Sequence, residues 1–139
     1  MTGSYSTRSV SEWIEILSAP DKEQRANATD ALIAYGNVSI PALFDVLTHS
    51  DWRVRYRAAE ALGQIGPIAS HRADIISSLI ALTDDEKDHV RYMAAKGLVQ
   101  IRDPRARDAF QKLMHDSHSY TRTMAEEGLV YVLENNEGG

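Results

Sequence analysis

The chain has 139 residues, of which 43% are hydrophobic and 25% charged, as expected for a single globular domain. It has no cysteine, which excludes disulfides, thiolate metal sites and cysteine nucleophiles. The net charge of -5 argues against general nucleic-acid binding, and no apolar run approaches the about 18 residues of a membrane span. We therefore expect a cytoplasmic protein without a nucleic-acid or membrane partner.

The first part of the chain predicts a tail followed by a pair of helices. Residues 1–9 are small and polar and lack periodicity, which predicts a disordered N-terminal tail. Apolar residues then recur at helical spacing over residues 10–36, where Pro20 separates a first helix from a second one. Ser9 or Ser11 is placed to cap the first helix, and Gly36 is placed to close the second in a left-handed conformation.

Three further units follow the same plan of two helices joined by a short turn. They span residues 37–66, 67–103 and 104–133. The third unit is longer and carries an acidic turn, from Thr83 to Asp88. We expect Asp88 to cap the helix that follows and the rest of this turn to be solvated. Residues 134–139 form a polar C-terminal tail that is expected to fray.

The second helix of every unit carries one repeated pattern. An arginine is followed three residues later by an alanine and four residues after that by a leucine. The repeat arginines are Arg25, Arg55, Arg91 and Arg122, at separations of 30, 36 and 31 residues. One pair of helices cannot bury its own apolar stripe, so neighbouring units must stack. The sequence therefore predicts an all-α, right-handed solenoid of four helical hairpins.

The best preserved copy of the pattern also resembles a known family. It runs from Leu47 to Gly66, with Asp51, Arg55 and Ala58 at fixed spacing before Ala61-Leu62. This run resembles the short HEAT-like repeat, also called the phycobilin-lyase HEAT-like repeat. The resemblance covers about residues 10–133 and implies that the second helices line a concave side. Such repeats occur in scaffolds, chaperones and a few enzymes, so the fold alone does not define a function.

The repeated acidic and basic residues predict a structural ladder. Aspartates lie one helical turn before the arginine in the first two units, and Asp88 or Asp85 could partner Arg91, as Asp116 could partner Arg122. Because these residues recur with the repeat, we interpret the aspartate as a helix cap and the arginine as a link to the next unit's turn. The predicted ladder comprises Asp21, Arg25, Asp51, Arg55, Arg91 and Arg122.

A stripe of aromatic and charged residues lies beside the core face of the second helices. Its candidate partner-binding residues are Trp52, Arg53, Tyr56, Arg57, Glu60, His89, Tyr92, Met93, Lys96 and Tyr120. Tryptophan, tyrosine and arginine dominate binding hot spots, because they bring large contact areas with few rotors to immobilise. The stripe predicts a groove for another protein, and the alternative is a solvated face with scattered tyrosines.

No catalytic, metal or cofactor site is expected. Deoxyhypusine hydroxylase is built of similar repeats and takes its iron ligands from His-Glu pairs directly after the repeat arginine. The corresponding pairs here are Ala26-Asn27, Tyr56-Arg57, Tyr92-Met93 and Thr123-Met124. His115 and His118 flank an aspartate in a turn that we interpret as solvated. The sequence also lacks a nucleophile with its base and a glycine-rich phosphate loop.

The last helix carries five consecutive apolar residues, Leu129 to Leu133. A terminal unit of a solenoid should turn a polar face outward. Val130 or Tyr131 could therefore form an oligomer surface, or alternatively lie against the tail.

These patterns favour a non-catalytic scaffold or adaptor that grips a segment of another protein in its concave groove. The alternative, which follows only from the family resemblance, is a bilin lyase or a bilin-handling accessory subunit.

Overall fold

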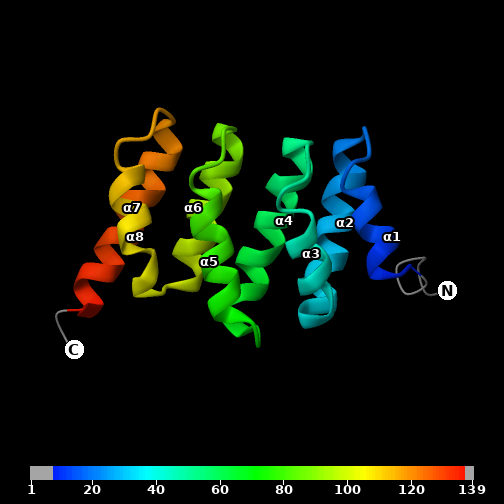
Figure 1. Cartoon of the computed structure of the whole chain (residues 1–139), viewed down its shortest axis with the longest axis horizontal. Helices are drawn as coiled ribbons and strands as arrows, with labels where there is room; N and C mark the ends of the chain where they lie inside the picture. Colours follow the sequence, from blue (N-terminus) through cyan, green and yellow to red (C-terminus); the bar gives the residue numbers. More distant parts are fainter. Residues whose placement is uncertain (1–7, 137–139) are drawn as a thin grey trace.

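The computed structural model describes residues 8–136, in which the regular elements are eight α-helices and three short 3₁₀ helices. The α-helices are α1 (Val10–Ile16), α2 (Lys22–Tyr35), α3 (Ile40–Asp45), α4 (Trp52–Ile65), α5 (Arg72–Leu82), α6 (Asp88–Ile101), α7 (Arg107–Leu113) and α8 (Ser119–Asn136). They stand side by side in one row, with the two ends of the chain at opposite ends of the row (Figure 1).

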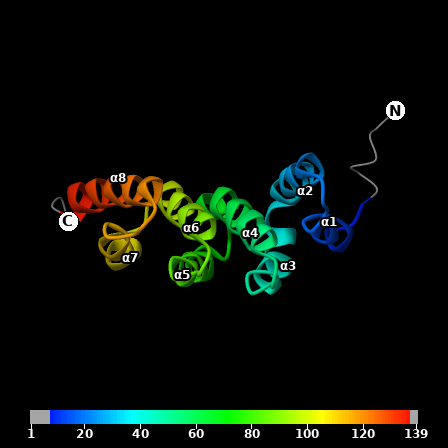
Figure 2. The same ribbon diagram turned by 90° about the horizontal axis from the view of Figure 1, so that it is seen from above.

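The helices form two layers. Viewed from above, α1, α3, α5 and α7 make one layer and α2, α4, α6 and α8 make the other (Figure 2). Successive helices of the second layer contact one another, from α2 to α4, from α4 to α6 and from α6 to α8. The predicted all-α solenoid of four helical hairpins is thereby confirmed. We call the solvent side of α2, α4, α6 and α8 the even-helix face.

Local capping explains where the first helices begin and end. The Ser9 hydroxyl accepts a hydrogen bond from the Glu12 N–H, and the Glu12 carboxylate accepts one from the Ser9 N–H, which together form a capping box. Asp21 and Asp51 cap α2 and α4 through their carboxylates. Gly36 follows α2 with a φ of 59°, a backbone conformation that strains any residue with a β-carbon.

Three expectations about the ends of elements differ from the structure. Lys87, and not Asp88, precedes α6, because the carboxylate that accepts the Lys87 N–H belongs to Asp85. The last helix continues to Asn136, past the expected boundary at residue 133. Ser9 belongs to the first helical cap rather than to a tail; the rest of the predicted tails, residues 1–7 and 137–139, lies outside the described residues.

Small residues allow the middle units to pack closely. A β-carbon on Gly63 would lie only 2.7 Å from the Gly97 Cα, so α4 and α6 approach backbone to backbone. Ala58 and Ala94 are fully buried in the same layer. This close approach joins α4 to α6 toward their C-terminal ends, and the side chains at the starts of the same helices make the face described next.

Candidate functional site

Each ladder arginine first fixes the turn of its own unit. In all four units its Nη1 atom donates to the carbonyl of the residue six positions earlier. The pairs are Arg25 with Ala19 (2.7 Å), Arg55 with His49 (2.7 Å), Arg91 with Asp85 (3.0 Å) and Arg122 with Asp116 (2.7 Å). The repeat arginine therefore holds the start of its helix against the preceding turn.

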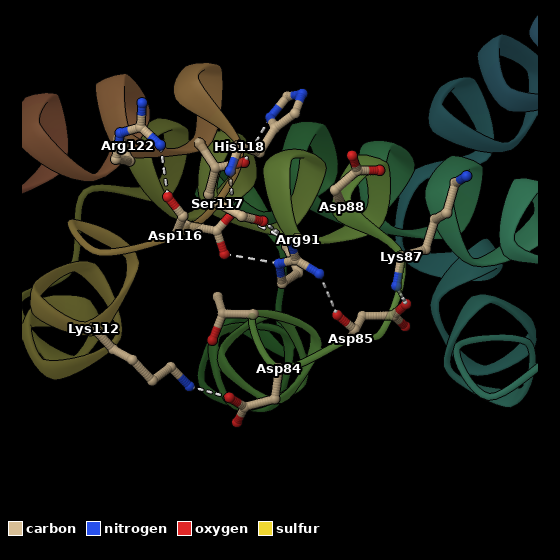
Figure 3. A network of polar contacts seen from close by, with 12 residues as sticks. Asp84, Asp85, Lys87, Asp88, Arg91, Lys112, Asp116, Ser117, His118 and Arg122 are labelled. Atoms are coloured by element: carbon tan, nitrogen blue, oxygen red, sulfur yellow. Dashed lines mark hydrogen bonds and ion pairs between the residues drawn. The ribbon is translucent and has the colours of Figure 1, made fainter.

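Two of these arginines also bind the next unit. Arg55 donates from Nε and Nη2 to both carboxylate oxygens of Asp85, at 2.8 and 3.0 Å. Arg91 donates from Nε to Asp116 at 2.8 Å (Figure 3). The hydrogen bond to Asp85 raises the pKa of Arg55. Burial alone would raise the pKa of Asp116, but the hydrogen bonds from Arg91 and from the His118 N–H, together with the positive charge of Arg91, outweigh it and lower that pKa.

Each of these two aspartate carboxylates therefore pairs with the arginine of the preceding unit, and not with the arginine of its own unit as predicted. Asp116 accepts the side chain of Arg91 through its carboxylate, and Arg122 only through its carbonyl. Asp85 in the same way serves Arg55 through its carboxylate and Arg91 through its carbonyl. The reason is geometric, because a capping carboxylate lies at the end of its own helix, whereas the arginine side chain reaches sideways to the next turn.

The first junction lacks this carboxylate. His49 occupies the position that corresponds to Asp85 and Asp116, six residues before its repeat arginine. Its Nδ1 atom accepts the Asp51 N–H at 3.0 Å, as the two aspartates accept N–H groups in their own turns. The turn is thus satisfied, but the position that would supply a carboxylate to Arg25 is occupied by an imidazole.

The acidic turn before α6 is solvated at Asp84 and Glu86, as expected, but the Asp85 side chain is nearly buried in an ion pair. Asp84 pairs with Lys112, and Asp85 pairs with Arg55. The Asp88 carboxylate lies 2.7 Å from the His89 Nδ1 atom, and this hydrogen bond lowers the pKa of Asp88.

Six rings from three units make an unbroken chain of contacts along the even-helix face. We call these residues the aromatic strip: Trp52, Tyr56, His89, Tyr92, His118 and Tyr120. The ring centroids are 4.9 Å apart for Trp52 and His89, 6.3 Å for His89 and His118, and 5.7 Å for His118 and Tyr120. Tyr56 joins at 6.2 Å from Trp52, and Tyr92 joins at 6.1 Å from His118 and 6.4 Å from Tyr120. These separations are within the range of favourable aromatic contacts.

The strip is accessible at the surface. Tyr120 is 69% exposed, His89 is exposed, and the other four rings are half-buried. Burial raises the pKa of Tyr56, which keeps its hydroxyl protonated. Half-buried rings that are held by their neighbours present apolar area without the freedom of fully exposed side chains.

Cations flank the strip. The Arg53 guanidinium and the Lys87 ammonium lie 5.6 and 4.6 Å from the Trp52 ring centroid. Arg57 lies 5.6 Å from the Tyr56 ring and also forms an ion pair with Glu60 at 2.9 Å. Within residues 8–136, no carboxylate pairs with Arg53, Lys87 or Lys96.

The structure changes the membership of the predicted stripe at three positions. Met93 is only 4% exposed and packs in the core between the helices, so it does not belong to the face. His118 and Lys87 join instead, although sequence reasoning assigned the first to a solvated turn and overlooked the second. Both lie four residues before their repeat arginine. Alignment of that position across the units would have placed them at one edge of the face.

The two residues of the predicted oligomer surface differ in their surroundings. Val130 is 51% exposed, as is its neighbour Leu133 at 50%. Tyr131 is partly buried, with the Arg102 guanidinium 5.4 Å from its ring centroid. Only Val130 of the predicted pair is therefore well exposed.

The other layer contains one further hollow of interest. A crevice between α3 and α5 is lined by apolar atoms of Phe44, Leu47 and Ala81, beside the Arg55–Asp85 pair. Over residues 8–136, no group of three or more histidine or acidic side chains is arranged to hold a metal ion. None of the helices in that range combines the length and apolar character needed to cross a membrane.

The fold and its ladder define an α-helical repeat protein, a class of solenoid that is typical of protein-binding scaffolds. The sequence pattern of HEAT repeats matches residues 10–73 and 68–130, and the chain therefore belongs to the HEAT repeat family. No curated protein matches the sequence.

The solved structures with a similar fold include engineered proteins and designed armadillo repeat proteins. The chain is similar to an engineered protein from a structural genomics consortium, with 22% identity and a TM-score of 0.62 over 90% of this chain and 62% of that one. It is also similar to a designed armadillo repeat protein in complex with peptide (KR)4, with 17% identity and a TM-score of 0.61 over 88% of this chain and 64% of the other. The chain thus spans less than two thirds of these structures, and the likeness shows the fold alone.

Proposed function

We propose that this protein is a non-catalytic scaffold that holds a segment of another protein on the aromatic strip. The observation that carries the proposal is the unbroken series of ring contacts from α4 across α6 to α8. A solvated face has no physical need for six adjoining rings, whereas a binding face uses them as anchors.

The arrangement also suits binding energetically. Rings that already contact one another have lost part of their rotamer freedom before a partner arrives, which lowers the entropy cost of association. The strip crosses three units in a line, so a segment in extended conformation can contact each unit in turn. A designed armadillo repeat protein of similar fold is in complex with peptide (KR)4, which supports the choice of a peptide segment as the partner.

A peptide-display selection on the immobilised protein tests the proposal. The affinities of the enriched peptides are then measured by fluorescence anisotropy for the wild type and for Trp52→Ala and Tyr120→Ala. The Tyr120→Ala variant is the cleaner one, because this ring is mostly exposed and its removal leaves the core intact. Removal of an anchor should weaken binding by about tenfold or more.

A matched control is Ile68→Ala, since Ile68 is an exposed apolar residue beyond the other end of α4. It should bind the same peptides as the wild type does. Enriched peptides that bind the two strip variants with unchanged affinity would show that the strip is not the site, and the crevice between α3 and α5 would then be the next surface to mutate.

The alternative of a bilin-handling accessory subunit rests on the sequence resemblance to the phycobilin-lyase repeats. A titration of the protein into an open-chain tetrapyrrole, followed by absorbance, separates the two functions. A shifted and saturable spectrum would favour bilin handling over the scaffold.

We also infer that the C-terminal end mediates pairing of two copies of the chain. Val130 and Leu133 expose apolar surface there. Sedimentation velocity over the micromolar range should show a dimer that Val130→Lys disrupts. A monomer at all concentrations would overturn this inference.

A further inference from the structure

We propose that the aromatic strip selects acidic segments, in which carboxylates alternate with apolar or aromatic side chains. This inference rests on the proposed function of the strip and names the chemistry of the partner. Its basis is the set of cations beside the rings that have no carboxylate partner over residues 8–136.

Cations without a carboxylate partner in the described part of the chain lie beside the strip, although the whole chain carries a net charge of -5. Of the four cations beside the rings, only Arg57 forms an ion pair, with Glu60. Arg53, Lys87 and Lys96 have no carboxylate partner within residues 8–136. The ladder arginines Arg55 and Arg91, in contrast, are each neutralised by an aspartate.

The acidic groups nearest to the strip are already committed to other partners. Asp51 caps α4 by accepting the Arg53 N–H. Asp88 accepts hydrogen bonds from the ring and the backbone of His89, and Glu60 accepts one from Arg57. None of these carboxylates forms an ion pair with the three unpaired cations, so each of these cations is free to pair with a carboxylate of a ligand on the rings.

The positions of the cations explain how a carboxylate would be held. Lys87 and Arg53 both lie against the Trp52 ring, so a carboxylate paired with either of them would sit beside that ring. Lys96 follows Tyr92 by one helical turn on α6 and therefore lies on the same side of that helix. A segment with an apolar side chain on the rings and carboxylates beside it meets both requirements, whereas a basic segment would meet like charges.

The test begins with the peptide-display selection at low salt, and then measures how charge governs the affinity of the enriched peptides. Fluorescence anisotropy gives the affinity for the wild type and for Arg53→Glu and Lys87→Glu. Both positions lie at the start of a helix, where a negative side chain is favourable, so the variants should fold. The control is Arg107→Glu, an exposed cation on α7 in the other layer.

We expect aspartate and glutamate to be enriched in the selected peptides. Each charge reversal at the strip should weaken binding by about three- to tenfold, and 0.5 M salt should do the same, whereas the control should bind as the wild type does. Peptide (KR)4 serves as the probe of opposite charge and should not bind detectably.

The outcomes separate this inference from the proposed function on which it rests. Peptides that lose affinity on Tyr120→Ala but are neutral or basic, or that ignore both charge reversals, would overturn the acidic preference and leave the strip as the binding site. Peptides that ignore Tyr120→Ala and Trp52→Ala would overturn the strip itself. Acidic peptides that lose affinity on both kinds of variant support both statements.

Discussion

The ion pair between Arg55 and Asp85 should govern how firmly the second unit is joined to the third. Both side chains are nearly buried, with 10% and 9% of their surface exposed, and two hydrogen bonds connect them. Removal of one partner from a buried pair leaves the other charge without compensation and costs about 3–5 kcal/mol. We choose Arg55→Met, which keeps the apolar stem of the side chain.

The expected loss lies near the lower end of that range, at about 3 kcal/mol. Asp85 keeps its hydrogen bond from the Lys87 N–H after the substitution, at 2.9 Å, and can admit water from the crevice beside it. The variant also loses the hydrogen bonds from Arg55 to the carbonyls of His49 and Ser50. Compared with the about 5–15 kcal/mol of total stability in a typical domain, this loss is large.

Urea unfolding followed by circular dichroism measures the effect. Because each unit of a solenoid contacts only its neighbours, a weakened junction should broaden the transition or split it in two. The control is Arg57→Met on the same helix, which removes an ion pair and a cation–π contact that both lie within α4, and it should cost about 0.5–1 kcal/mol. If Arg55→Met costs no more than Arg57→Met and leaves the transition sharp, the ladder does not join the units.

Three further substitutions test other parts of the structure. His49→Asp supplies the carboxylate that Arg25 lacks at the first junction, and it should raise the free energy of unfolding by about 1 kcal/mol in urea titrations; a loss of stability would contradict the equivalence of the turns. The hydrogen bond from Arg105 lowers the pKa of Asp103 to about 2. The stability that depends on ionised Asp103 is therefore present above about pH 4 and disappears as the pH falls toward 2, so that Asp103→Asn should reduce the acid sensitivity of the melting temperature by an amount equivalent to about 1 kcal/mol. An unchanged pH profile would contradict that assignment. Gly63→Ala places a β-carbon 2.7 Å from the Gly97 Cα and should lower thermal stability by about 1–3 kcal/mol despite the better helix propensity of alanine; a stabilised variant would show that α4 and α6 can separate without cost.

The fold follows from the sequence because the same local constraints recur in every unit. The spacing of Arg55, Ala58 and Leu62 fixes one helix face, and its return in the other units predicts the stacked hairpins. The cap at Asp51 and the left-handed Gly36 are equally local, and the structure contains both. Features within about one helical turn were therefore predictable.

Features that depend on how one unit is displaced relative to the next could not be predicted from the sequence. The sequence suggests Asp116 as the partner of Arg122, one and a half turns away, whereas its carboxylate binds Arg91 on the neighbouring unit. The same offset buries Met93 and brings His118 beside His89. A helical wheel gives the direction in which a side chain leaves its helix, but not which neighbouring element lies in that direction. For a residue at the edge of the core face, the neighbouring element decides whether the side chain is buried or exposed.

The ladder and the aromatic strip occupy the same two junctions, which suggests that one positions the other. Asp85 and Asp116 each accept a ladder arginine on one side and, on the other, the N–H of the residue two positions later, Lys87 or His118. Each of these arginine–aspartate pairs therefore fixes the position, along the helix axis, at which the following second helix begins. The residues of the aromatic strip lie in or next to the first turns of α4, α6 and α8. At the junction between α2 and α4, His49 occupies the position of the aspartate, and α2 contributes no ring to the strip. If the arginine–aspartate pairs hold the rings in line, loss of the Asp116 carboxylate should weaken partner binding, even though this residue supplies none of the six rings of the strip.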